Sequence, residues 1–155
     1  MSMKTKTKIK IKNLSRLERK LLRIPSDVLK PLKRQLFLSA NSVSTTAIKG
    51  IQGGSRTGVI YYRGGKSAQR SGPGEYPKTD RGGLVSSIFV KPIKSIGGLG
   101  YAVGTKLKYA IGLEFGKRKM AARPWLFPSF KSNVKEIKRD IRIALNKVLR
   151  SSARR

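Results

Sequence analysis

One apolar stripe near the C-terminus constrains the fold more than any other feature of this sequence. Its six residues recur at spacings of 4, 3, 4, 3 and 4: Phe130, Val134, Ile137, Ile141, Ala144 and Val148. This is the period of one face of an α-helix, and Lys and Arg fill many of the remaining positions. Because such a helix is stable mainly through the packing of its apolar face, the stripe demands other elements to cover it.

A second apolar stripe predicts another helix in the first third of the chain. Its residues follow Pro31 at spacings of 4, 4, 3 and 4, and the helix should reach about Lys49: Leu32, Leu36, Ala40, Val43 and Ala47. Upstream, Ser15 and Glu18 form a capping box that predicts a short helix ending before Pro25.

Between the two long helices the pattern favours strands and turns. Residues 58 to 63, "GVIYYR", predict one half of a hairpin, and residues 64 to 83 predict a long loop. Residues 87 to 95 and 99 to 105 predict an antiparallel pair of strands, with a tight turn at Gly97 and Gly98 between them.

Two short helical segments are expected beside these strands. Thr79 or Asp80 should cap a helical turn around Leu84. Residues 106 to 115 predict a short helix that Gly116 ends in the αL conformation.

Together the elements predict an α+β fold in a single domain, residues 14 to 155. A small antiparallel sheet should pack against a long N-terminal helix and a C-terminal amphipathic helix. The chain has 155 residues, enough for one domain with a core and too few for two comfortable ones. Residues 1 to 13 form a separate basic arm.

The arm alternates lysines with Thr and Ile in a period of two, the period of a strand. The lysines are Lys4, Lys6, Lys8, Lys10 and Lys12. Repulsion among them opposes folding of the isolated segment, so two interpretations stay open. The arm is either solvated and flexible, or it orders as an edge strand on a partner with its lysines toward solvent or phosphate.

The charge of the chain names a class of partner. Its 36 Lys and Arg face seven Asp and Glu, for a net charge of +29, which points to a polyanion and most often to nucleic acid. In the long loop, Arg63, Lys66 and Arg70 lie among tyrosines and are candidates for DNA or anion contacts. A solvated, charged loop is the plainer interpretation.

The residue types exclude much enzymology. Without Cys or His there is no thiol nucleophile, no zinc site of the usual kind and no His acid or base. The acidic residues form no pair suited to holding a metal or to acid and base catalysis. We therefore expect no catalytic residue, cofactor or metal. The sequence also lacks an apolar run long enough to cross a bilayer and a signal-peptide pattern, so we expect a cytosolic protein without a membrane partner.

The order of four motifs resembles the small neck and tail-completion proteins of long-tailed bacteriophages, which join head to tail. That family carries a P-G-E-x-P loop, a T-G-x-L-x-x-S-I segment, a Y-A-x-x-x-E-F-G motif and a R-P-F-L-x-P-A motif before its last helix. The resemblance covers about residues 28 to 150. The matching positions are Pro73, Gly74, Glu75 and Pro77; Thr79, Gly83, Leu84, Ser87 and Ile88; Tyr109, Ala110, Glu114, Phe115 and Gly116; and Arg123, Pro124, Leu126 and Pro128.

Some positions depart from the family pattern. Residues 80 to 82 are extra spacing, Trp125 replaces the common Phe, and the basic arm has no counterpart. The resemblance implies an α+β subunit of a homo-oligomeric ring, with six copies expected. The ring would stand in the virion between the portal assembly and the tail tube, with DNA in its lumen and neck, connector and tail-tube proteins as neighbours. Assembly would take place in the host cytoplasm.

Glu114 is the one acid in the stretch that carries the last two motifs. It has no catalytic partner, and near a helix C-terminus it needs a cation, so we expect a structural ion pair with Arg123, with Lys117 as the other candidate. Pro124 and Pro128 should hold "RPWLFP" extended. Phe115, Trp125, Leu126 and Phe127 are expected to be anchors of either the core or a subunit interface.

A second function class fits the charge equally well. A sequence-independent basic nucleic-acid-binding protein of ribosomal type needs a strongly basic surface, but it needs neither the E-F-G motif nor the "RPWLFP" segment.

Overall fold

The computed structural model describes residues 19, 25–26, 28–78, 81–93, 99–118 and 120–153. The basic arm, the predicted helix after Ser15 and the predicted turn at Gly97 and Gly98 lie outside these residues. The described elements are α2 (Lys30–Gly53), β1 (Ile60–Arg63), β2 (Lys66–Gln69), α3 (Gly83–Ser87), β3 (Phe89–Ile93), β4 (Gly100–Gly104), α4 (Lys108–Phe115) and α5 (Leu126–Ala153). The fold is α+β, as predicted.

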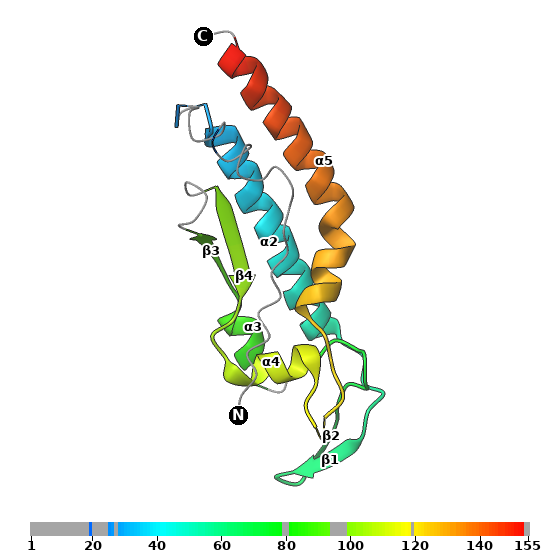
Figure 1. Cartoon of the computed structure of the whole chain (residues 1–155). Coiled ribbons are helices and arrows are strands. Elements are labelled where there is room, and N and C mark those ends of the chain that lie inside the picture. Colours follow the sequence, from blue (N-terminus) through cyan, green and yellow to red (C-terminus); the bar gives the residue numbers. More distant parts are fainter. Residues whose placement is uncertain are drawn as a thin grey trace.

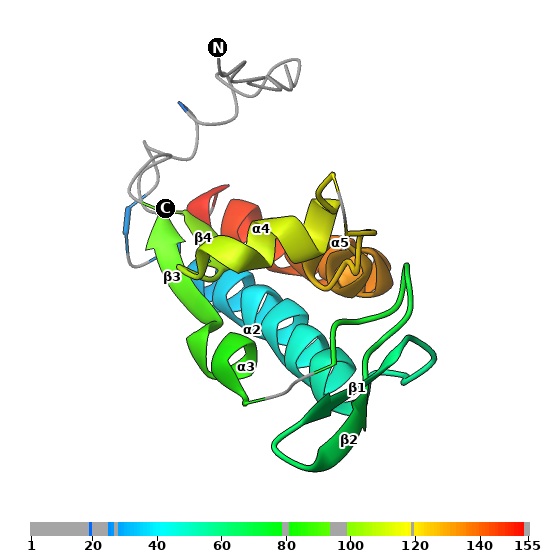
Figure 2. The ribbon, with the colours of Figure 1, turned by 90° about the horizontal axis from the view of Figure 1, so that it is seen from below.

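Helix α2 is the centre of the fold. The β3–β4 sheet lies along one side of it and α5 along another, while α3 and α4 lie near one end of the sheet (Figure 1). The view from below also shows α2 between the β3–β4 sheet and α5 (Figure 2). The β1–β2 hairpin lies beyond the lower end of the helices (Figure 1). Among the described residues no helix is both long and apolar enough to cross a membrane.

Helix α2 confirms the apolar stripe that begins at Leu32, and it extends past the predicted end at Lys49 to Gly53. Pro31 lies in its first turn, where a missing backbone N–H costs no helical hydrogen bond. At the other end, the Lys78 Nζ atom donates to the carbonyls of Gln52 and Gly54, at 3.0 and 3.3 Å. This cation satisfies carbonyls that the helix end leaves open.

Strands β3 and β4 confirm the predicted antiparallel pair. Phe89 lies opposite Gly104 and Ile93 opposite Gly100, so the pairing covers the full length of both strands. The predicted helical turn before them is α3, and its N-cap position is Gly82 with a φ of 73°. Thr79 and Asp80, the expected caps, lie outside the described residues.

The β1–β2 hairpin corrects part of the long predicted loop. Strand β1 was expected, but residues 66 to 69 form its antiparallel partner instead of loop. Gly64 and Gly65 connect the strands with φ values of 56° and 74°. Positive φ at both central residues defines the type I′ turn, which matches the twist of a two-stranded hairpin and which Gly adopts without steric cost.

The core consists of two separate apolar clusters along α2. The upper cluster joins the start of α2 to the end of α5 and includes Leu32, Ala144 and Val148. The lower cluster joins the end of α2 to α3 and α4, and includes Ile51 and Trp125. Between the clusters, α2 also buries Ala40 and Val43, which belong to neither cluster.

Candidate functional site

The junction of α4 and α5 organises the lower half of the molecule. The Glu114 carboxylate accepts three backbone hydrogen bonds from the start of α5: from the N–H groups of Trp125 at 2.8 Å, Leu126 at 2.9 Å and Phe127 at 2.8 Å. A carboxylate at a helix N-terminus is favoured both by these donors and by the helix dipole. Glu114 is therefore the cap of α5.

Pro128 accounts for the fourth backbone position at the start of α5. An α-helix leaves its first four backbone N–H groups without a partner inside the helix. Here three of them bond to Glu114, and the fourth position is Pro128, which has no N–H. The predicted extended segment is thus wrong beyond Trp125, because α5 begins at Leu126 and takes Pro128 into its first turn.

Arg123 does not pair with Glu114, and that prediction is wrong. Both residues are described, and Glu114 directs both carboxylate oxygens at backbone N–H groups. The Nε atom of Arg123 donates to the Ser71 carbonyl at 2.9 Å, and the Arg123 N–H donates to the Leu113 carbonyl at 2.7 Å. Arg123 therefore ties the α4–α5 connection to the loop after β2. Gly116 also differs from its predicted αL geometry, since its φ of 78° comes with a ψ of 174°.

Glu75 holds together the loop that carries the P-G-E-x-P match. Glu75 accepts from the Thr57 hydroxyl at 2.7 Å and from the Gly72 N–H at 2.6 Å. These two hydrogen bonds, the Thr57 hydroxyl first, lower the pKa of Glu75 from its ordinary value of 4.5. The Gly74 N–H donates to the Ala122 carbonyl at 2.8 Å, so the loop and the segment before α5 hold each other.

An apolar groove of about 690 Å³ opens between the two core clusters. Its walls come from the middle of α2, from β4, from α4 and from the first half of α5. They include Leu36, Ala40 and Val43; Tyr101 and Val103; Ile111, Glu114 and Phe115; and Trp125, Phe127, Phe130, Ile137 and Ile141. Glu114 is the one Asp, Glu, Lys or Arg residue among these, and the start of α5 already uses both of its oxygens.

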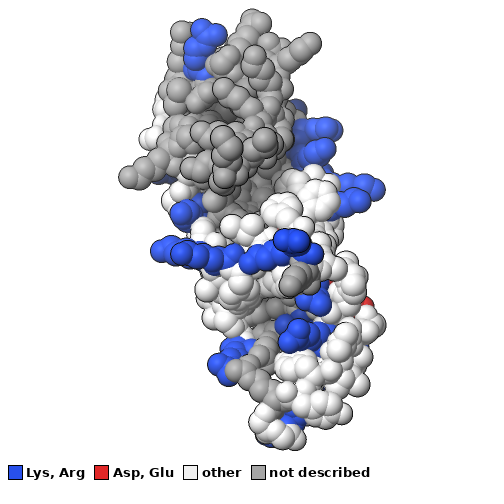
Figure 3. Space-filling model, turned by 60° about the horizontal axis from the view of Figure 1, so that its bottom comes forward, with Lys and Arg blue, Asp and Glu red and all other residues white. Residues whose placement is uncertain are grey.

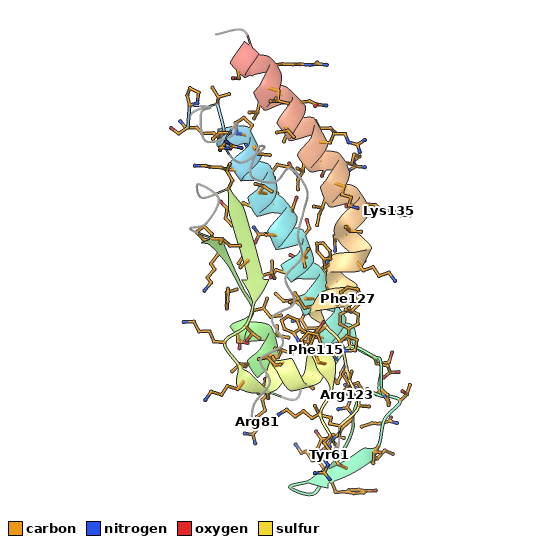
Figure 4. All side chains as sticks on the ribbon, in the orientation of Figure 1. Tyr61, Arg81, Phe115, Arg123, Phe127 and Lys135 are labelled. Carbon is orange, nitrogen blue, oxygen red and sulfur yellow. The ribbon has the colours of Figure 1, made fainter. Side chains whose placement is uncertain are left out.

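The four predicted anchors divide between core and surface. Trp125 is 3% exposed and belongs to the lower cluster, and the partly buried Leu126 packs against it. Phe115 and Phe127 are 81% and 65% exposed, and both line the groove. Figure 4 places them at the meeting of α4 and α5. The structure therefore assigns Trp125 and Leu126 to the core, and for Phe115 and Phe127 the subunit interface stays a prediction.

The predicted cation sites are only partly described. Lys66 and Arg70 are exposed on the hairpin, and the Arg70 guanidinium lies 4.7 Å from the centre of the Tyr61 ring. Arg63 is described by its backbone alone, opposite Lys66, and the five arm lysines lie outside the described residues. Figure 3 shows Lys and Arg scattered over the described surface, with acidic side chains nearly absent from that face.

The described acids form no metal centre: no group of three or more potential ligands occurs in that part of the chain. Comparison of the chain with protein-family models, with curated proteins and with solved structures gave no match. The proposed function therefore rests on the exposed surfaces of the protein. Sequence reasoning missed the groove because its lining comes from four elements, although the α2 and α5 stripes supplied two of its walls.

Proposed function

We propose that the protein is a structural virion protein of the head-to-tail interface of a long-tailed bacteriophage. It forms a homo-oligomeric neck or tail-completion ring, with six copies expected, that joins the portal side to the tail tube and lets DNA pass. The observation that carries the proposal is the open apolar groove with Phe115 and Phe127 at its edge. Such a subunit acts by positioning its neighbours and performs no reaction.

Exposed aromatic side chains around a groove are typical of a protein interface. Soluble monomers rarely leave a large contiguous apolar surface uncovered. Phe side chains are enriched in the buried centre of interfaces, where charged residues are depleted. This chain has Lys or Arg at many surface positions, yet the groove has none along its lining. The contrast supports a surface that is covered in the assembled particle.

The net charge of +29 fits the same role. A ring with DNA in its lumen places each subunit beside a dense row of phosphates, which attract Lys and Arg at any sequence. Like charges on neighbouring subunits repel one another, so the polyanion, or acidic neighbouring proteins, would also stabilise the ring.

A basic nucleic-acid-binding protein of ribosomal type is the second candidate. It is favoured by the exposed Lys66 and Arg70 beside the Tyr61 ring, since cations and aromatic rings together bind phosphates and bases. That function does not require a groove, and a monomer would serve.

The deciding measurement is the native mass, by light scattering at moderate salt, with and without purified tail tubes or portal-bearing capsids. We expect a ring, or incorporation into one of the particles. A persistent monomer that ignores both particles and binds duplex DNA or RNA with a steep salt dependence would contradict the virion function and support the second candidate.

A pair of variants sharpens this measurement. Replacing Phe115 and Phe127 by Ser should abolish assembly and leave the thermal unfolding temperature nearly unchanged, because both side chains are mostly exposed. The matched control is Ile143→Ser: Ile143 is exposed on α5 but does not line the groove. Equal loss of assembly in the control would show that the groove has no special part in it.

A further inference from the structure

We infer that the β1–β2 hairpin of one copy inserts its uncharged face into the apolar groove of the next copy, so that subunits join head to tail. This inference rests on the proposed function, because it names the two surfaces through which subunits of the ring meet. It concerns the contact between copies and leaves open which particle the ring joins.

The hairpin has two chemically different faces. Residues directly opposite in an antiparallel pair share a face, so Ile60 lies with Gln69 and Tyr62 lies with Ser67. That face has no charged residue. The alternate positions place Lys66 on the other face, where Arg70 contacts the Tyr61 ring. The strands therefore place no cation beside Ile60 and Tyr62, while Tyr61 and Ala68 share the face of the cations.

The two apolar side chains of the uncharged face are open to solvent. Tyr62 is 82% exposed and Ile60 is 55% exposed. Extensive packing joins α2 to α5, β3 and β4, and neither hairpin strand takes part in it. An isolated two-stranded hairpin is marginally stable in water and needs further packing to become a firm structural element. A supporting surface on another molecule would supply that packing.

A projecting hairpin suits a groove better than a second groove does. Two concave grooves that face each other across a two-fold axis leave space between them, whereas a projecting ribbon fills a groove directly.

Charge favours the same fit. Burying an unpaired cation in an apolar site costs on the order of several kcal/mol of free energy. Insertion of the Ile60 and Tyr62 face buries none, because Lys66 and Arg70 lie on the opposite face. Glu114, the one acid of the groove, is already bonded to α5. The contact can thus form between two molecules that each carry a net charge of +29.

The positions of the two surfaces predict the symmetry. Phe115 and Phe127 lie at the junction of α4 and α5, and Tyr61 lies on the separate hairpin (Figure 4). A contact between different surfaces of identical chains is heterologous, and repeated heterologous contacts close into a ring when the rotation permits. One interface would then build the whole ring.

The absence of Cys from the sequence allows a direct test. Full-length chains carrying Tyr62→Cys and Phe127→Cys are mixed and mildly oxidised, and each is also oxidised alone. We expect a covalent dimer in the mixture at several times the yield of either chain alone, and a ladder of covalent oligomers from the double variant. The control mixes Tyr62→Cys with Ile143→Cys, which lies outside the groove and should give only background dimer.

A second measurement does not depend on disulfide geometry. Replacing Ile60 and Tyr62 by Ser should raise the concentration for half-assembly on the order of tenfold or more, as expected for losing an aromatic anchor. Ala68→Ser, on the opposite face of the hairpin, should leave that concentration unchanged. Circular dichroism of both variants checks that the helices of the protein still fold.

The outcomes separate the inference from the proposed function. Rings that form without the Tyr62 to Phe127 cross-link, and despite the Ile60 and Tyr62 substitutions, would overturn the inference and leave the ring function standing. A cross-link from Phe127→Cys to Ile9→Cys instead would assign the groove to the basic arm and would also overturn it. A chain that never assembles, alone or on either particle, would overturn both.

Discussion

Glu114 and Trp125 connect the end of one helix to the start of the next. The Glu114 carboxylate accepts a hydrogen bond from the Trp125 N–H at 2.8 Å, while the Trp125 side chain is buried in the lower apolar cluster. Trp125 thus has its backbone held by α4 and its ring held by the core. Together these contacts fix where α5 begins and the direction that it takes.

Removing the Glu114 carboxylate should destabilise the fold. Glu114→Ala leaves three N–H groups of α5 without their acceptor, and we expect a loss of about 2 kcal/mol in the free energy of unfolding. For a chain of this size the unfolding temperature should fall by about 4–8 °C. Glu114→Gln, which keeps one acceptor oxygen, should lose less.

The control for this prediction is Glu136→Ala. Glu136 pairs with Arg139 on the exposed side of α5, so its loss should cost less than about 0.5 kcal/mol. Thermal unfolding followed by circular dichroism measures all three variants. If Glu114→Ala and Glu136→Ala unfold at the same temperature, the hydrogen bonds from Glu114 to the start of α5 contribute nothing special to stability.

Trp125→Ala should weaken folding far more than the loss of a surface lysine. Truncating a fully buried aromatic side chain costs about 3–5 kcal/mol. Lys135 is exposed on α5 (Figure 4), and Lys135→Ala should change stability by less than about 0.5 kcal/mol. Urea unfolding gives both free energies, and similar values for the two variants would place Trp125 outside the core.

Two glycines of the same helix should respond in opposite directions. A Cβ atom at Gly50 would overlap the ring of Tyr76, whose hydroxyl is hydrogen-bonded to Ser129 at 3.0 Å. At Gly53 a Cβ atom would meet nothing within 4 Å. Gly50→Ala should therefore lower the unfolding temperature, because Tyr76 must move.

Gly53→Ala serves as the matched control for this substitution. Ala is favoured over Gly in a helix by up to about 1 kcal/mol, so the Gly53 variant should be neutral or slightly more stable than the parent. Thermal unfolding of both variants tests the packing of Tyr76 on α2. An equal rise in both would mean that the ring does not need the space at Gly50.

Glu75 should give a small pH-dependent contribution to stability. Its pKa is lowered in the folded chain, so the unfolded chain binds its proton more readily. The contribution is therefore present above the ordinary pKa of 4.5 and is lost as the pH falls through the lower folded value. The difference in unfolding temperature between the parent and Glu75→Gln should shrink below about pH 4.5.

Thr57→Val tests the cause of that shift. It removes the hydroxyl that contributes most to it, so the Glu75 pKa, followed by NMR of the carboxyl carbon, should rise toward 4.5. A Glu75 pKa that does not move in this variant would contradict the assigned cause.

If the five arm lysines contact DNA, they should make the affinity for DNA more sensitive to salt. If all five neutralise phosphates, they contribute about −4.5 to the slope of log affinity against log salt, or roughly 500-fold between 50 and 200 mM. Replacing Lys4, Lys6, Lys8, Lys10 and Lys12 by Gln should remove that part, measured by fluorescence anisotropy on a short duplex. An unchanged slope would mean that the arm does not touch DNA.

Periodic patterns predicted the long-range architecture correctly. The stripes of α2 and α5 and the alternation in β3 and β4 report which face of an element is buried, and that information is local in sequence. Strand β2 was missed because residues 66 to 69, "KSAQ", combine polar side chains with exposure on most positions. Its pairing depends on the turn at Gly64 and Gly65 rather than on its own pattern.

The Glu114 prediction failed for an instructive reason. The sequence indicated that this lone acid was structural, but charge alone suggested a cation as its partner. A sequence does not tell which backbone N–H groups will lie near a given carboxylate. Pro128 was the available signal, because proline is common in the first turn of a helix and would have placed the predicted start of α5 further upstream. The groove could not be predicted, because it depends on how four separate elements fit together.

The cap between α4 and α5 also has a mechanical meaning. Helix α5 has 28 residues and so extends for about 40 Å from the carboxylate that holds its first turn. Near its other end, Ala144 and Val148 pack against the start of α2, so α5 is held at both ends. The helix therefore acts as a brace that spans the two apolar clusters and fixes the distance between the two halves of the core.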